Sequence, residues 1–168
     1  MSSDALALMI VATGAGTAAA IDLRTRRVPN VLTMSLAAAG ITLAASGLGH
    51  ITVGAALGGG LLGLLLMLPG HVLGATGGGD VKLLSAIGTL LGPAATVWAF
   101  LIAMIAGGAI AVFVAVRRGR LLLAMQQSAE LVRTAGGNAH GIEHPQAHNR
   151  FAYAPAIAIG AILAGVFA

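Results

Sequence analysis

Cysteine is absent from the 168-residue sequence, and charged side chains make up only 8% of it. Without cysteine the chain can form no disulfide, no thiolate nucleophile and no cysteine-ligated zinc site. Soluble domains carry charge on about a quarter of their residues, so a soluble fold is a poor fit. The sequence is instead 58% hydrophobic and holds 25 glycines, small residues that let membrane helices approach closely. We therefore expect a single all-α membrane domain over residues 1–168.

Six apolar runs are candidates for membrane spans, because about 17–25 apolar residues in a helix cross a bilayer. They cover residues 5–21, 31–46, 51–73, 81–91, 94–116 and 151–168. The fourth run is short, but with six spans all 9 lysines and arginines fall on one side of the membrane. The positive-inside rule makes that side cytoplasmic. Both chain ends are then expected outside.

The segment 117–150 is the one sizeable polar stretch and is predicted to be a cytoplasmic loop. It contains His140, His144 and His148, a spacing of four that would form a metal-binding face on a helix. Pro145 and the local glycines argue against a helix there. We therefore expect a solvated loop, no metal site and no cofactor, and the role of the three histidines stays open.

Asp22 and Asp80 stand where apolar runs meet polar segments, in a chain with only 5 acidic residues. A charged side chain at the centre of a membrane helix costs about 2.5–3.5 kcal/mol, so such residues are functional candidates. The expected topology brings both to the cytoplasmic end of the bundle. Two carboxylates held close share a proton, so that one can activate water while the other polarises a peptide carbonyl. The pair is therefore a candidate catalytic dyad.

The glycines before Asp80 and the lysine after it can have either a functional or a structural role. Gly77, Gly78 and Gly79 make room for an extended substrate, whereas a plain helix-start turn would need only one glycine. Asp80 begins a helix, whose N-terminal dipole favours a negative charge. Lys82 either reinforces that effect or extends to the lipid headgroups, and His71 can reach the glycine loop.

The sequence resembles the type IV prepilin peptidase family of membrane aspartyl proteases. Gly77-Gly78-Gly79-Asp80 fits the Gly-x-Gly-Asp signature, and Asp22 followed by Arg27-Val28-Pro29-Asn30 is similar to the first-aspartate motif. The last run, with Pro155, is similar to the proline-containing C-terminal segment of that family. We expect Asn30 to cap the second helix rather than to bind substrate.

The resemblance implies an aspartic endopeptidase of six membrane helices, with Asp22 and Asp80 catalytic at the cytoplasmic face of the bacterial inner membrane. It implies prepilin precursors and the lipid bilayer as partners, no nucleic acid, and cleavage between a basic leader and an apolar segment. The chain resembles the short form associated with tight-adherence (Flp-type) pili. It lacks the paired-cysteine zinc motif and the extra N-terminal domain of larger members, so methyltransferase activity is not expected. The oligomeric state, the particular prepilin and its cleavage site stay open.

Three other functions stay open. A transporter or channel could bind a cation or relay protons through the aspartates, although the apolar runs between them hold no further charge. A non-catalytic assembly factor could use the fold for helix contacts alone. A metal-dependent lipid-modifying enzyme would ordinarily need more carboxylates on one face.

Overall fold

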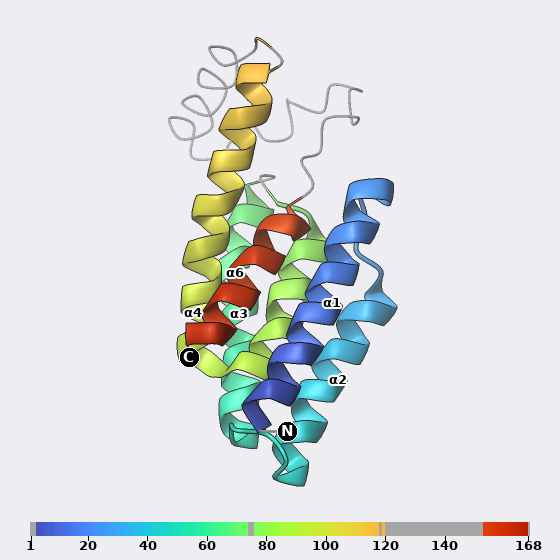
Figure 1. Cartoon of the computed structure of the whole chain (residues 1–168), viewed down its shortest axis with the longest axis vertical. Helices are drawn as coiled ribbons and strands as arrows, with labels where there is room; N and C mark the ends of the chain where they lie inside the picture. Colours follow the sequence, from blue (N-terminus) through green and yellow to red (C-terminus); the bar gives the residue numbers. More distant parts are fainter. Residues whose placement is uncertain (1–2, 74–75, 118, 120–152, 168) are drawn as a thin grey trace.

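The computed structural model describes residues 3–73, 76–117, 119 and 153–167. Every regular element in these ranges is an α-helix, and the helices pack side by side in one bundle (Figure 1). They are α1 (Ser3–Thr25), α2 (Asn30–Ser46), α3 (Val53–Val72), α4 (Gly78–Arg117) and α6 (Ala154–Phe167). Nearly all of the expected loop 117–150, with His140, His144 and His148, lies outside the described residues.

Three of the helices are long and apolar enough to cross a membrane: Ala5–Thr25, Val53–Val72 and Gly78–Val114. The helices α2 and α6 are also apolar but shorter. The expectation of an all-α, multi-pass membrane protein is thus confirmed. The count of six spans is not reproduced, because the expected runs 81–91 and 94–116 belong to one element, α4.

A sharp bend at Gly92 divides α4 into two arms. The backbone there has φ 77° and ψ 176°, and Pro93 follows. In Figure 1 the first arm, residues 78–91, and the second arm, residues 93–117, run in opposite directions. The break between the expected runs 81–91 and 94–116 therefore falls at this bend, within an element that is helical on both sides.

Close contacts between glycines and backbone hold the centre of the bundle together. A Cβ at Gly59 of α3 would overlap the carbonyl oxygen of Gly88, and a Cβ at Gly63 would lie 2.7 Å from the carbonyl oxygen of Leu84. On the other side of α4, Gly160 of α6 lies equally close to the backbone of Ala99. Small residues thus let α3 and α6 pack directly against the two arms of α4, as the glycine content led us to expect.

The core is apolar, and each buried threonine hydroxyl donates to a carbonyl oxygen of its own helix. Its largest fully buried side chains are Leu83, Leu84, Ile87, Ile157, Val11 and Thr96. The Thr96 hydroxyl donates to the carbonyl oxygen of Gly92 at 2.6 Å, and that of Thr89 to Ala86 at 2.7 Å. These bonds satisfy the hydroxyls locally, so the bundle buries few polar groups. Asp22 and Asp80 are the exceptions that define a site.

Candidate active site

Asp22 lies in the last turn of α1 with its side chain only 6% exposed. The helix ends directly after it, because Arg26 adopts a left-handed conformation with φ 55°. The Arg26 N–H donates to the carbonyl oxygen of Asp22 at 2.8 Å, which is the bond of a left-handed helix cap. The Arg26 charge also acts electrostatically on the Asp22 carboxylate. The chain thus turns away while the carboxylate stays inside the bundle.

Asp80 lies in the first turn of α4 and is 7% exposed. Its Oδ2 accepts the N–H of Gly77 at 3.1 Å, and its own N–H donates to the carbonyl oxygen of Gly77 at 3.1 Å. A side chain three residues into a helix that bonds back to the first N–H is half of a capping box. This reciprocal pair fixes the direction of the Asp80 carboxylate and explains why Gly77 precedes it.

The fold brings the two aspartates together. They are distant in sequence, yet the Asp22 charge acts electrostatically on the Asp80 carboxylate. The Oδ2 of Asp22 accepts the N–H of Ala154, the first residue of α6, at 3.3 Å. Each carboxylate therefore accepts a backbone N–H at a helix N-terminus, where the dipole favours negative charge. We expected a helix N-terminus to stabilise the negative charge of Asp80 alone. Because Asp22 also lies at a helix N-terminus, that of α6, this effect does not distinguish the two carboxylates.

Tyr153 is a site residue that the sequence reasoning missed. Its Oη lies 3.3 Å from both the carbonyl oxygen of Ala103 and the sulfur of Met104, on the second arm of α4. The Tyr153 side chain is half-buried, and the charge of Asp80 acts on its hydroxyl electrostatically. The tyrosine directly precedes Ala154 and so anchors the residue that bonds Asp22. The one signal in the sequence was an aromatic residue placed just before the Ala-Pro start of the last helix.

The turn after α1 packs on the glycine loop. A Cβ at Gly79 would lie 3.1 Å from the Cβ of Val28, so the two aspartate-bearing motifs touch through this pair. Behind the loop, the His71 ring bonds through Nδ1 to the carbonyl oxygen of Thr76 at 3.1 Å. The expectation that His71 reaches the loop is confirmed.

The expectation that Asn30 caps α2 is wrong. Pro29 occupies the N-cap position with φ −65° and ψ 135°, and no side chain caps the helix. Asn30 is already helical, and its Oδ1 accepts the ammonium of Lys82 at 3.0 Å. Lys82 thus ties the start of α2 to α4. Arg27 contributes a carbonyl oxygen that accepts the Thr25 hydroxyl at 3.1 Å.

Pro155 stands at the second position of α6. The first-turn N–H groups of a helix have no partner within it, so a proline there sacrifices no hydrogen bond. Its fixed φ favours the helical turn that presents the Ala154 N–H to Asp22. The proline therefore has a structural role beside the site.

A helical membrane bundle that buries two interacting carboxylates at one end has the make-up of an intramembrane hydrolase of the aspartic type. The model of the type IV leader peptidase family matches residues 9–112, more than half of the chain. The chain therefore belongs to the type IV leader peptidase family, whose members are aspartic peptidases that cleave prepilin leader peptides. The match includes Asp22 and Asp80 and ends before α6. No match is found among curated proteins, and none among solved structures.

Proposed function

We propose that Asp22 and Asp80 are the catalytic pair of this peptidase. The observation that carries the proposal is that both carboxylates are buried, that their charges interact, and that each accepts one backbone N–H from the start of a helix, α6 for Asp22 and α4 for Asp80. A pair of carboxylates that holds one proton can act as base and acid together. The ionised carboxylate takes a proton from water, the water oxygen attacks the peptide carbonyl, and the protonated carboxyl donates to the carbonyl oxygen. The C–N bond of the resulting diol then breaks as the carboxyl that took the water proton donates it to the nitrogen. The other carboxylate takes a proton from a diol hydroxyl, which leaves a carboxylic acid, an amine and the pair with one proton again. The pair needs no metal or other cofactor for this reaction.

The substrate we propose is a Flp-type prepilin, cut at the cytoplasmic face of the bacterial inner membrane. Counting the two arms of α4 separately gives six crossings in a single membrane domain, with the N-terminus outside. The charge distribution supports this orientation, because the end of α1, the start of α4 and the end of α4 lie at the same end of the bundle as the aspartates (Figure 1). Arg24, Arg26, Arg27, Lys82 and Arg117 stand at or next to these helix ends in the chain. The glycine loop beside Asp80 leaves space for an extended peptide.

Leader cleavage of a co-expressed Flp-type prepilin tests the proposal, read as a mobility shift. Asp22→Asn and Asp80→Asn should each abolish the shift, because an amide can neither accept the water proton nor take part in the shared proton. Asp4→Asn is the matched control, since Asp4 lies near the opposite end of α1 from Asp22. Cleavage that persists in either site variant removes that aspartate from the mechanism. If the unmodified chain cleaves no prepilin, a transporter that uses the same aspartates becomes the better explanation.

A further inference from the structure

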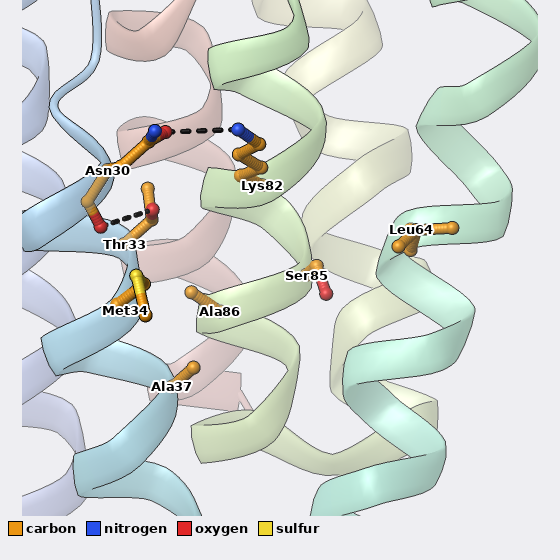
Figure 2. A pocket seen from close by; sticks show the side chains of 8 residues that line it. All are labelled: Asn30, Thr33, Met34, Ala37, Leu64, Lys82, Ser85 and Ala86. Atoms are coloured by element: carbon orange, nitrogen blue, oxygen red, sulfur yellow. Dashed lines mark hydrogen bonds between the residues drawn. The ribbon is translucent and has the colours of Figure 1, made fainter.

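A groove lies between α2, α3 and the first arm of α4, beside the aspartates. Its volume is about 270 Å³, below the range of about 300–1,000 Å³ that sites for whole small molecules occupy. It is lined by Asn30, Thr33, Met34, Ala37, Leu64, Lys82, Ser85 and Ala86 (Figure 2). The residues from α2 and those from α4 recur at intervals of three and four, so each set forms one stripe of its helix.

The groove is polar at one end and apolar along the rest. The hydrogen bond between Lys82 and Asn30 crosses the polar end (Figure 2). Deeper in, the Thr33 hydroxyl donates to the carbonyl oxygen of Asn30 at 3.0 Å, and the Ser85 hydroxyl donates to that of Gly60 at 2.8 Å. Because these hydroxyls are already bonded to the protein, the walls below the mouth present mainly hydrocarbon.

The polar end of the groove adjoins the site. Lys82 follows Asp80 by two residues on α4, and Asn30 follows Val28, which packs on Gly79. From this end the groove runs away from the aspartates, along α2 and the first arm of α4. The polar end of the groove therefore lies within two residues of Asp80 along α4 and next to the turn that packs on the glycine loop.

We propose that this groove receives one face of the apolar helix of the prepilin substrate. The inference rests on the proposed function, because it assumes that Asp22 and Asp80 perform the cleavage. A substrate cut at the end of a membrane bundle keeps its apolar segment within the bilayer. The cut end of that segment would lie at the polar end of the groove, and the apolar residues that follow would lie along its apolar walls. The volume fits a few side chains of a helix rather than the whole helix. Met34 and Leu64, which are 71% and 37% exposed, are the side chains that would contact it.

The absence of cysteine from the chain permits a disulfide cross-linking test. Met34→Cys places a thiol in the groove, whereas Ser35→Cys places one on the next residue of α2, which is also exposed but does not line it. Each variant is co-expressed with a Flp-type prepilin that carries single cysteines along its apolar segment. Cross-linking and leader cleavage are read on the same samples.

We expect a cross-link with Met34→Cys at prepilin positions one helical turn apart, and none with Ser35→Cys. In parallel, Met34→Trp should reduce kcat/KM about tenfold, mainly through KM, because the bulky ring occupies the groove. Met9→Trp, at an exposed methionine of α1, is the control and should leave cleavage unchanged.

Cleavage of the prepilin with equal cross-linking at both positions, or with none at Met34→Cys, would show that lipid rather than substrate fills the groove and would overturn this inference alone. Absence of cleavage by the unmodified chain would overturn the proposed function and the inference together.

Discussion

The three glycines before Asp80 differ in what surrounds them. A Cβ at Gly77 would lie 3.2 Å from Oδ2 of Asp80, and one at Gly79 would lie 3.1 Å from the Cβ of Val28. A Cβ at Gly78 would meet only the His71 ring, at an ordinary contact distance of 3.5 Å. The two crowded positions are the fixed glycines of the Gly-x-Gly-Asp signature, and the roomy one is its variable position. The structure thus gives a steric reason for the signature.

We expect Gly77→Ala and Gly79→Ala to lower leader cleavage about tenfold or more, because displacing a catalytic group by a fraction of an ångström is costly. Gly78→Ala is the control and should stay within about twofold of the unmodified chain, because the added methyl group would make only an ordinary contact with the His71 ring. The measurement is kcat/KM on a prepilin, with the amount of folded protein determined for each variant. Equal losses at all three positions would argue that the loop needs flexibility rather than space.

A single site residue can be recognised from the sequence when its type is rare among the residues around it. Asp22 and Asp80 could be singled out as candidate site residues from the sequence, since carboxylates are costly among apolar residues. The Ala154 N–H that bonds Asp22 was not, because every residue except proline carries such a group and only the fold selects its partner. Asn30 misled because the usual preference for asparagine at an N-cap was overridden by the extended backbone of Pro29 one residue earlier.

At the scale of the elements, the bend in α4 depends on one backbone conformation. Gly92 has φ 77° and ψ 176°, a region that is essentially restricted to glycine. The space beside it would admit a methyl group, since a Cβ would lie 3.5 Å from the nearest atom, Cγ2 of Ile51. The glycine is therefore required for its backbone rather than for packing.

Gly92→Ala should destabilise the bundle by of order 1–3 kcal/mol, the cost of a strained residue. Gly16→Ala offers a matched control in α1, where a Cβ would meet no atom within 4 Å. Alanine is the better helix former by roughly 1 kcal/mol, so the control should be neutral or stabilising. Thermal unfolding in detergent measures both. A Gly92→Ala variant as stable as the control would mean that the bend tolerates other backbone angles.

The expected number of helices differs from the observed one at this bend, where two expected runs form the single element α4. Hydropathy located the reversal between the expected runs 81–91 and 94–116, but it does not reveal that helical hydrogen bonding resumes directly on either side of Gly92. The lengths of α2 and α6 were also beyond hydropathy alone. Pro29 sets the start of α2, and Gly47 ends it in a left-handed conformation with φ 69°.

At the scale of the whole molecule, the two ends of the bundle have different chemistry. At one end α1 ends and both α4 and α6 begin, whereas the other end holds the 47–52 connection and the bend in α4 (Figure 1). The aspartates, Tyr153 and the described lysine and arginines belong to the first end by their places in these helices. Ile51 lies beside Gly92 at that second end, because a Cβ built on the glycine would be 3.5 Å from Cγ2 of the isoleucine. The proposed orientation follows from this asymmetry, because basic residues are retained on the cytoplasmic side.

Two leucines at opposite ends of α3 test the orientation. Leu48 precedes the helix and Leu73 follows it, and their side chains are 64% and 44% exposed. In the cysteine-free chain, Leu48→Cys should react with a membrane-impermeant maleimide on spheroplasts, since we place that end outside. Leu73→Cys should react only after the membrane is opened, because it lies beside the glycine loop at the proposed cytoplasmic end. The reverse pattern would put the aspartates outside and require that the leader be cut after export. Labelling of both variants from one side would mean that α3 does not cross the bilayer, and the proposed count of six crossings would then fail with it.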